Sequence, residues 1–515
     1  MREAARRSAL QRRRDCCLTA VVAVALTWLA VFTWRMRQNI LQRPPSPGIL
    51  FRDRLNATGL ALRDGLSRVV HGIKLWDRPQ HLGPMELDYS HVRVGAKDIH
   101  EFHNNTDSSE VHIIFSTDCK PFMDYQTLVL FHSAVLAGHR GPVTRIVSGC
   151  KDSKESFLKS LYAKLYPKYH VHFTPDFAYD PVKKVRYVYF NKPYGLKHWL
   201  EHADPPVGAD TIVCLLDPDM ILLRPITPEI RGLEGLDPKI PVAELFDRVT
   251  RGKPAAAVYG LGAPWTTEGG KYFRKRDICP PGSPCLTTTT EFGERHFSVG
   301  PPYMVHRDDM LRIADSWSRF AKPVHSQYPE LLAEMYAYSI AAAHESLPHL
   351  QVSTYMVSNI HMDNEEGWQL VDALSDVCET PQGTIFQPGR PLPLVLHHCQ
   401  NYRAGLMGWA KRRPELLGIF SCDSGLLLEP PSDLGFLDWK MKEGKVIFAL
   451  ITSNLRMIYA IQRTTKPRKQ IKRNAFMICV THRMVNAAAT YYKQMMCTDR
   501  EANYSKVIKL EPVGG

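Results

Sequence analysis

The stretch Thr211-Ile-Val-Cys-Leu-Leu-Asp-Pro-Asp-Met-Ile-Leu-Leu223 places two carboxylates, Asp217 and Asp219, between two apolar runs. Burying carboxylates without a cation is costly. A divalent ion bound there by oxygen ligands would compensate both charges. It would also neutralise the phosphates of a nucleotide-sugar as the diphosphate departs. Asp-Pro-Asp is also a good turn sequence, so a purely structural interpretation of the tripeptide stays open.

The segments on either side of this stretch alternate between strand and helix patterns. Strands are predicted at 111–116, 143–147, 171–173, 210–216 and 255–259, and helices at 125–137, 155–165, 194–203, 308–320 and 329–344. This alternation predicts an α/β fold with a mostly parallel, doubly wound sheet, whose ligands bind beyond the carboxyl ends of the strands. Residues 262–298, rich in Gly, Pro and Thr, are expected to form a long surface loop that acts as a lid.

Four further side chains are candidates for the site, each with a structural alternative. A histidine in Val395-Leu-His-His398 could add a nitrogen ligand or simply pack. Glu334 lies among apolar and aromatic neighbours, where a half-buried carboxylate can act as a base or an orienting group. Lys192 could contact a phosphate, or Pro193 beside it could merely start a helix. Arg145 could contact a phosphate or form a structural salt bridge.

The charge distribution argues against a nucleic-acid partner. The net charge is +13, but residues 436–515 hold 15 Lys and Arg against 5 Asp and Glu, and the first fifteen residues hold 6 against 2. The stretch between has 44 against 45 and is nearly neutral. Binding a phosphate backbone requires clustered cations over many contacts. No nucleic acid is therefore expected as a partner.

The N-terminal region predicts a membrane anchor. Residues 16–34 contain no charged side chain over 19 residues, which is long enough to span a bilayer as a helix. The arginines before this run predict a cytosolic N-terminus and a lumenal remainder, which is type II topology. A cleaved signal peptide is the alternative, but Trp28, Phe32 and Trp34 offer no small-residue cleavage site.

Five regions are predicted: a cytosolic tail (1–15), a transmembrane anchor (16–34), a stem (35–108), a lumenal catalytic domain (109–435) and a basic C-terminal extension (436–515). In an oxidising lumen some of the twelve cysteines should form disulfides. Cys279 and Cys285 are the expected local pair, because the turn residues between them can bring their ends together.

Six ordered segments resemble the hydroxyproline O-arabinosyltransferase-like glycosyltransferases, and within them the peptidyl serine α-galactosyltransferases. The resemblance covers about residues 111 to 430. It rests on Thr117-Asp-Cys119 with Tyr125-Gln-Thr127, Gly141-Pro-Val-Thr-Arg145 with Ser148, Asn191-Lys-Pro193 with Gly195 and Trp199-Leu200, Leu216-Asp-Pro-Asp-Met220, Glu334-Met-Tyr-Ala-Tyr-Ser339 and Val395-Leu-His-His398.

The resemblance implies a GT-A glycosyltransferase fold, a UDP-sugar donor, Mn²⁺ or another divalent cation, and retention of anomeric configuration. It implies a Golgi or ER membrane enzyme that modifies Ser or hydroxyproline hydroxyls of secreted polypeptides. The resemblance implies that Asp217 and Asp219 form the motif that binds the metal ion and the diphosphate, and that His398 is the third metal ligand. The remaining donor-side candidates are Thr117, Asp118, Arg145, Asn191 and Lys192. Glu334 is the acceptor-side candidate.

Several alternatives stay open at this point. Pro218 resembles the arabinosyltransferase version of the motif, whereas Asn191-Lys-Pro-Tyr-Gly195 resembles the galactosyltransferase version, so the donor sugar is unsettled. A metal-dependent phosphohydrolase would also place Asp and His around an ion, although it usually needs a second cluster. A lumenal binding protein that kept the fold without turnover is the alternative outside enzymes.

Overall fold

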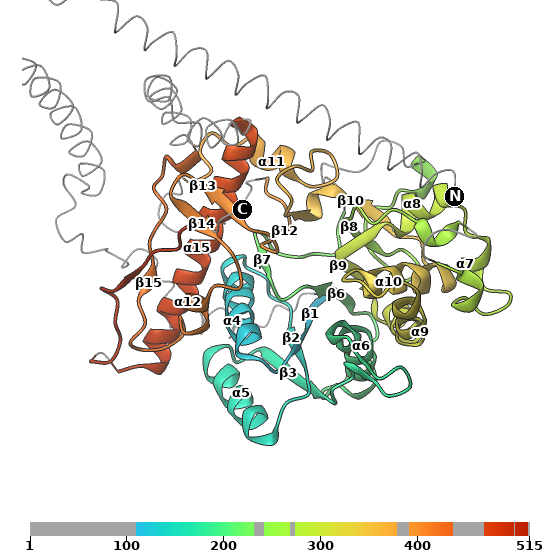
Figure 1. Ribbon diagram of the computed structural model, residues 1–515, viewed down its shortest axis with the longest axis horizontal. Helices are drawn as coiled ribbons and strands as arrows, with labels where there is room; N and C mark the ends of the chain where they lie inside the picture. The colour runs from blue at the N-terminus through green and yellow to red at the C-terminus, as the bar shows by residue number, and fades with distance from the viewer. Residues whose placement is uncertain are drawn as a thin grey trace, which may run out of the picture. The chain divides into compact units, whose positions relative to one another are not determined.

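A seven-stranded sheet lies at the centre of the computed structural model, which describes residues 110–230, 241–267, 273–378, 391–435, 468–498 and 500–512 (Figure 1). The strand order is β10-β8-β9-β6-β1-β2-β3. The bounds are β1 Val111–Asp118, β2 Val143–Ser148, β3 Tyr169–Thr174, β6 Ile212–Leu216, β8 Ala255–Val258, β9 Val299–His306 and β10 Leu350–Val352. All neighbours pair in parallel except β9, which is antiparallel to both β6 and β8. The predicted mostly parallel α/β sheet is confirmed.

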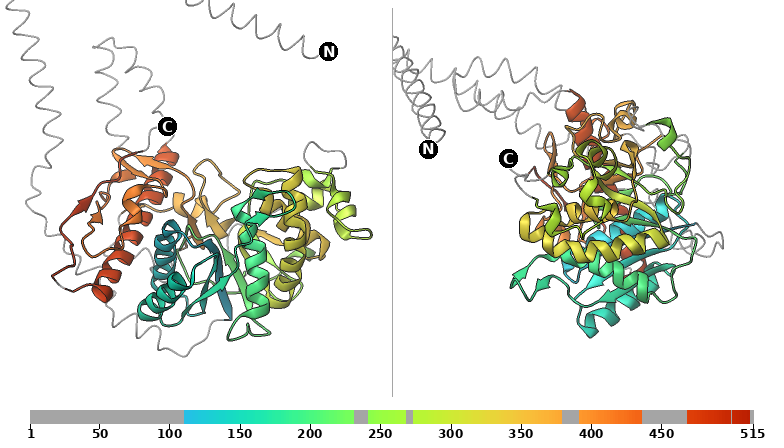
Figure 2. Two further views of the ribbon diagram at one scale, coloured as in Figure 1. Left: turned by 60° about the horizontal axis from the view of Figure 1, so that its bottom comes forward. Right: turned by 90° about the vertical axis from the view of Figure 1, so that its right-hand side faces the viewer.

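Helices cover both faces of this sheet, because successive strand residues point to opposite sides and both sides are apolar. Ile114, Val213 and Leu215 pack into one core with α6 (Asn191–His202), α9 (Arg307–Gln327) and α10 (Ala333–His344). Their neighbours along the strands pack into a second core with α4 (Pro121–Leu136) and α5 (Asp152–Leu165). Figure 2 shows the two groups of helices on opposite sides of the strands.

A small second sheet begins directly after the two carboxylates Asp217 and Asp219. After β6 the chain turns through Asp217, Pro218 and Asp219, and β7 (Met220–Leu222) leaves the main sheet. β7 pairs antiparallel with β12 (Val395–His397), which pairs in parallel with β11 (Met356–Val357). The register sets His397 opposite Met220. The carboxylate turn therefore lies beside a segment of the chain that is distant in sequence.

The predicted long loop at 262–298 contains helices, and that part of the prediction is wrong. Two short turns, η4 (Pro264–Thr266) and η5 (Lys275–Asp277), precede α7 (Pro284–Thr287) and α8 (Thr290–Phe297). Both helices begin at a hydroxyl cap, since Ser283 accepts from the amide of Cys285 and Thr289 accepts from the amide of Phe292. The Thr-rich run is thus a helix start.

The remaining short elements lie in the connections. They are β4 (Tyr179–Asp180), β5 (Val185–Arg186), η2 (Val188–Phe190), η3 (Val242–Glu244), η6 (Ser353–Tyr355), α11 (Trp368–Asp372), β13 (Tyr402–Ala404), β14 (Met407–Trp409), α12 (Pro414–Leu417), β15 (Leu426–Leu427) and β16 (Val507–Ile508).

The C-terminal helix α15 (Arg468–Met496) corrects the predicted domain boundary at residue 435. Most of its side chains are buried, and Phe476, Ile478 and Val485 belong to the core formed with the second sheet. The Arg473 guanidinium, fully buried, pairs with Asp372. The helix therefore belongs to the same compact unit as the second sheet and is not a separate extension. The sequence hid this because the excess of basic residues in 436–515 suggested a separate extension.

Four disulfides join eight of the ten described cysteines: Cys119–Cys150, Cys279–Cys285, Cys378–Cys479 and Cys422–Cys497, while Cys214 and Cys399 are free. The predicted Cys279–Cys285 pair is confirmed. Cys378–Cys479 and Cys422–Cys497 attach α15 to the rest of the domain. Among the helices of the described ranges, none has the length and apolar character needed to cross a bilayer. The predicted tail, anchor and stem (1–108) lie outside the described residues.

Candidate active site

A cavity of about 210 Å³ opens at the carboxyl ends of β1 and β6. The parallel strands and the following loops bring together side chains from distant parts of the chain. They are Ser116, Thr117 and Asp118 at the end of β1, Phe122, Met123 and Gln126 on α4, Val188, Tyr189, Asn191 and Lys192 near the start of α6, Asp217, Pro218 and Asp219 after β6, Tyr259 after β8, Leu331, Leu332, Glu334 and Met335 near the start of α10, His397 at the end of β12 with Cys399 after it, and Lys411 and Arg412 after β14.

Asp217, Asp219 and His397 form the chemical centre of this cavity. One ligand atom from each lies within 4.8 Å of the other two. Nε2 of His397 is 3.1 Å from Oδ1 of Asp219 and 3.9 Å from Oδ2 of Asp217. Asp219 and His397 are buried, whereas Asp217 is partly exposed. Burial opposes the charged form of Asp219, but His397 and Lys411 hold the pKa of this carboxyl well below its usual value.

The histidine beside the carboxylates is His397, which corrects the expectation for His398. The two residues are neighbours in an extended segment, so their side chains point in opposite directions. His397 faces the turn because it lies opposite Met220 in the register of β12 and β7. His398 gives its backbone amide to the carbonyl of Asp219, and its ring packs edge-on against Trp409 with centroids 5.2 Å apart. The sequence alone did not establish which of the two faces the turn.

Lys192 connects the carboxylate turn to Glu334. Its Nζ lies 2.8 Å from Oδ1 of Asp217 and 2.8 Å from Oε1 of Glu334. Burial lowers the pKa of Lys192, but the two carboxylates outweigh it and keep the ammonium charged. Burial and the charge of Asp217 together raise the pKa of Glu334 against the effect of Lys192. Oε2 of Glu334 is buried and has no hydrogen-bond partner among the described residues. This oxygen remains available to a ligand.

Two cations that the sequence analysis did not single out complete the polar side of the cavity. Lys411 pairs with Oδ2 of Asp219. Arg412 lines the cavity with its guanidinium carbon 5.5 Å from the ring centroid of Phe122. Both follow β14, within the Ala-Lys-Arg-Arg run at 410–413. That run is visible in the sequence, but nothing local places it at the end of β6.

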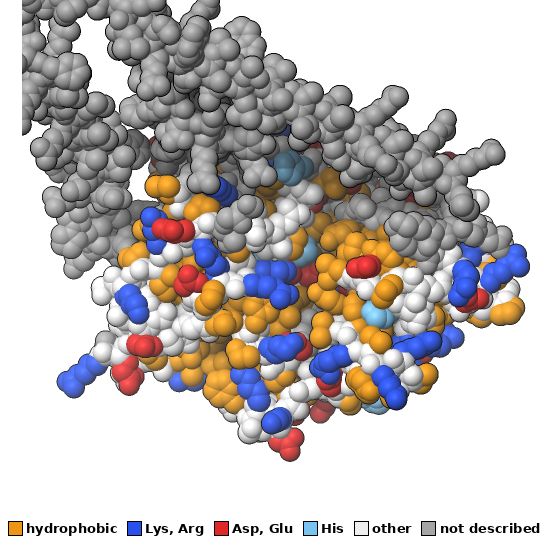
Figure 3. All heavy atoms as spheres, in the orientation of Figure 1, with side chains coloured by type: hydrophobic (Ala, Val, Ile, Leu, Met, Phe, Trp, Pro, Cys, Tyr) orange, Lys and Arg blue, Asp and Glu red, His pale blue; other side chains and the backbone are white. Residues whose placement is uncertain are grey.

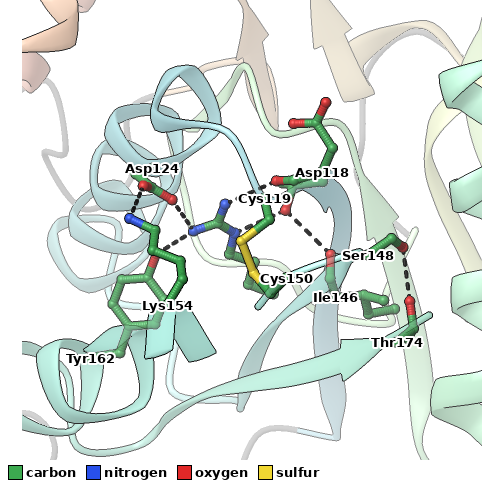
Figure 4. Close-up of a disulfide and its surroundings, with 11 residues drawn as sticks. Asp118, Cys119, Asp124, Ile146, Ser148, Cys150, Lys154, Tyr162 and Thr174 are labelled. Atoms are coloured by element: carbon green, nitrogen blue, oxygen red, sulfur yellow. Dashed lines mark hydrogen bonds and ion pairs between the residues drawn. A yellow bond between two sulfur atoms is a disulfide. The ribbon is translucent and has the colours of Figure 1, made fainter. Parts of the chain in front are cut away.

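Thr117 and Asp118 line the cavity at the end of β1, which continues into a loop that is fixed from behind. The Cys119–Cys150 disulfide joins this loop to the end of β2 (Figure 4). Asp118 pairs through Oδ2 with Lys120 at 2.6 Å, while its buried Oδ1 has no hydrogen-bond partner among the described residues. Thr117 accepts a hydrogen bond from Nε of Arg145 at 2.9 Å. The disulfide and these contacts therefore fix this side of the cavity, and Oδ1 of Asp118 remains available there as a hydrogen-bond acceptor.

Arg145 does not line the cavity, and its structural alternative fits better than a phosphate contact. The side chain is fully buried. Its guanidinium donates to Asp124 at 2.8 Å and to the hydroxyl of Tyr162. Lys154 pairs with the same aspartate (Figure 4). All these partners lie behind the loop, so Arg145 supports Thr117 and does not face a ligand.

Asn191 lines the cavity but uses its side chain within the fold. Oδ1 accepts from the amide of Phe177 at 2.7 Å, and Nδ2 donates to Asp176 at 3.3 Å. These bonds fix the segment 176–191 against the start of α6. Asn191 thereby places Lys192 next to it at the two carboxylates.

The donor set fits a divalent cation. Two carboxylates and an imidazole suit ions such as Mn²⁺, which accept oxygen and nitrogen ligands. The grouping is buried on one side and open to the cavity on the other, and Nδ1 of His397 is buried without a hydrogen-bond partner in the described ranges. The two aspartates also need positive charge in this setting, part of which Lys192 and Lys411 supply.

Comparison with solved structures finds glycosyltransferases. No family model matches the chain. The bifunctional glycosyltransferase WbbM has a TM-score of 0.30 with 10% identity, covering 58% of this chain and 47% of that chain. The galactosyltransferase LgtC, in complex with donor and acceptor sugar analogues, has a TM-score of 0.29 with 10% identity, covering 56% of this chain and 87% of that chain.

Two curated proteins match at the sequence level, and both are named peptidyl serine α-galactosyltransferase. The protein from Arabidopsis thaliana is 28% identical over 252 residues, which is 46% of this chain and 27% of the relative. The protein from Chlamydomonas reinhardtii is 25% identical over 255 residues, 46% of this chain and 30% of the relative. The match thus spans less than a third of each relative's length. Over these residues the chain is similar to two peptidyl serine α-galactosyltransferases, so its curated relatives are glycosyltransferases.

Proposed function

We propose that the protein is a UDP-sugar-dependent glycosyltransferase of GT-A type that transfers a sugar, with retention, to the hydroxyl of a serine or hydroxyproline in a polypeptide. The observation that carries this proposal is the grouping of Asp217, Asp219 and His397 at the strand ends, inside a cavity that also contains Lys192, Lys411 and Glu334. The sequence similarity to peptidyl serine α-galactosyltransferases supports galactose as the sugar.

The polar side of the cavity suits the donor. Asp217, Asp219 and His397 would hold Mn²⁺ or a similar ion, which when bound offsets the negative charge of the diphosphate leaving group. Lys411 and Arg412 add positive charge on the same side, where phosphate oxygens would be stabilised. The buried Oδ1 of Asp118 offers an acceptor for hydroxyl or N–H groups of the nucleoside. Thr117 and the disulfide keep that loop in place before the donor arrives.

Glu334 suits the acceptor. Its Oε1 is held by Lys192, and its raised pKa and unused Oε2 make it able to accept a hydrogen bond from a hydroxyl in the cavity. Lys192 ties this carboxylate to the turn that would hold the ion. The acceptor oxygen and the leaving group would then be positioned by one connected set of side chains.

A lumenal location in the Golgi or ER, behind an N-terminal type II anchor, completes the proposal. The uncharged run at 16–34 with preceding arginines supports the anchor. Four disulfides support an oxidising compartment. Secretion of a protein lacking residues 1–37 behind a cleavable signal, followed by an activity assay, tests this part.

The enzymatic proposal is tested by incubating the secreted domain with Mn²⁺, UDP-galactose or UDP-arabinose, and peptides containing serine or hydroxyproline. The expected result is transfer of galactose to peptide that stops when EDTA is added. Asp217→Asn and Asp219→Asn should each reduce transfer by several orders of magnitude while the protein stays folded. Phosphate release without transfer would instead indicate a phosphohydrolase, and saturable UDP-sugar binding with neither reaction would indicate a binding protein.

A further inference from the structure

A hairpin beside the cavity exposes apolar side chains. β4 and β5 are paired antiparallel, Tyr179 with Arg186 and Asp180 with Val185. Val182, at the tip, is 85% exposed, Tyr179 is 49% exposed and Val185 is also exposed. Oδ1 of the buried Asp180 accepts the amides of Val182 and Lys183, at 3.0 and 3.4 Å, and fixes the turn. These hydrogen bonds thus keep Val182 exposed at the tip of the hairpin.

This apolar surface continues into the cavity wall. The chain runs from β5 through Tyr187 to Val188 and Tyr189, both of which line the cavity. The hydroxyl of Tyr187 donates to the carbonyl of Leu331 at 2.8 Å and accepts the amide of Glu334 at 3.3 Å. Leu331 lines the cavity and is itself 61% exposed. Tyr179 and Arg186 are opposed in the hairpin, so they share one of its faces. An apolar strip, made of Tyr179, Val182, Val188 and Leu331, therefore leads from the hairpin tip to the neighbourhood of Glu334.

Exposure alone does not mark a binding surface. Hydrophobic side chains also appear among basic ones elsewhere on the described part of the surface (Figure 3). The strip differs because it ends at the proposed acceptor carboxylate. It also carries the exposed cations Lys183 and Lys184, which would repel a basic ligand.

We infer that the apolar strip is the docking surface for an extended acceptor polypeptide, whose residues beside the target hydroxyl are apolar and not basic. This inference rests on the proposed function, since it assumes that the hydroxyl is delivered to Glu334. A donor nucleotide is not the occupant, because its phosphates require the cationic side near Asp219. A polypeptide spans both the hairpin and the cavity when it is extended, since each residue adds about 3.3 Å.

The test uses Val182→Asp and Tyr179→Asp, with Phe157→Asp as control. Phe157 is 52% exposed on α5 and does not line the cavity. The probes are two synthetic peptides, one with serine flanked by proline and valine and one with serine flanked by lysine. Fluorescence anisotropy measures peptide binding. Steady-state assays measure the KM for the peptide, the KM for the UDP-sugar and hydrolysis of the UDP-sugar without peptide.

In the Val182→Asp variant, the KM and Kd for the apolar peptide should rise roughly tenfold, because a valine contact is replaced by a charge. The Lys-flanked peptide should bind more tightly to this variant than to the wild type. The KM for the UDP-sugar and its hydrolysis should stay unchanged. Phe157→Asp should change none of these quantities.

Equal peptide binding by the wild type and both hairpin variants would overturn the inference, and so would an equal loss in Phe157→Asp. If the Lys-flanked peptide bound more tightly to the wild type than to Val182→Asp, the inferred chemistry of the partner would be overturned. Because peptide binding is measured without turnover, the docking inference can be contradicted even when sugar transfer is observed. Peptide binding without any transfer would instead count against the proposed function.

Discussion

Nζ of Lys192 lies 2.8 Å from Oε1 of Glu334, and both side chains are buried in the wall of the cavity. A buried ion pair is costly to form, and such a pair does not by itself stabilise a fold. Here the lysine also contacts Asp217, so the pair links the proposed ion site to the acceptor side. This arrangement makes the charge of Glu334 testable separately from its packing.

Glu334→Gln should reduce sugar transfer on the order of 100-fold, because the amide keeps the shape and can still accept from Lys192 but carries no charge. The KM for the UDP-sugar should change little, and the thermal midpoint should stay within a few degrees. Asp372→Asn provides the control, since Asp372 pairs with the buried Arg473 away from the cavity. It should lower stability without lowering kcat. Full activity in Glu334→Gln would remove Glu334 from the reaction.

His397→Gln and His398→Gln should separate the adjacent histidines. His397 lies at the carboxylates, so its replacement should weaken Mn²⁺ binding at least tenfold, measured by calorimetry on the purified domain. His398 packs on Trp409, so its replacement should lower the thermal midpoint while leaving Mn²⁺ affinity within a few fold. The reverse pattern would restore His398 as the ligand and would contradict the register described for β12.

The sequence predicted the sheet and the carboxylate turn because both depend on local patterns. Apolar runs such as 212–216 form strands, and Asp217 and Asp219 follow one directly, so a strand-end site could be placed from the sequence alone. β9 escaped prediction. Its Val-Gly-Pro-Pro start contains residues that usually interrupt strands, and antiparallel pairing with β6 and β8 overrides that tendency.

Contacts between segments that are distant in sequence determine the parts of the site that local patterns could not predict. The choice between His397 and His398 follows from the register of β12 on β7, which no local pattern states. Lys411 reaches Asp219 across 192 positions of sequence. Arg145 looked like a phosphate ligand because arginine often serves that role. Its partners, the partly buried Asp124 on α4 and the buried Tyr162 on α5, come next to it only when these helices pack against β2.

The buried histidines should make the protein less stable in mild acid. Burial lowers the pKa of His132 from 6.5 to about 3. Burial also lowers the pKa of His349 to about 3, although a hydrogen bond to the carbonyl of Leu347 opposes the shift. At a pH between about 3 and 6.5, both histidines are protonated in the unfolded chain but neutral in the native state. The free energy of unfolding therefore falls as the pH drops below about 6.5.

Each of these two histidines should lower the free energy of unfolding by about 1.4 kcal/mol per pH unit well below pH 6.5, measured by urea unfolding between pH 6.0 and 4.5. His349→Gln should flatten the slope by about that amount. A slope unaffected by His349→Gln would show that the native state accommodates the protonated ring.

Deletion of all residues after Gly435 should prevent folding. The deletion removes α15, whose buried Phe476, Ile478 and Val485 pack with the second sheet beneath the proposed ion site. Each such side chain contributes roughly 1.5–3 kcal/mol by burial, so their loss together rivals the whole stability of a typical domain. The expected readout is intracellular retention or degradation of the truncated protein, and protease sensitivity of any that is recovered.

The matched comparison for this deletion is Cys378→Ser with Cys479→Ser, which keeps α15 but removes one of its covalent attachments. That double variant should fold with a free energy of unfolding about 2–5 kcal/mol lower and should retain sugar transfer, because the packing of the helix remains. Failure of both proteins to fold would assign the loss to the disulfide rather than to the buried face of the helix. A truncated protein that is secreted, resists proteolysis and transfers sugar would place α15 outside the catalytic unit and restore a boundary near residue 435.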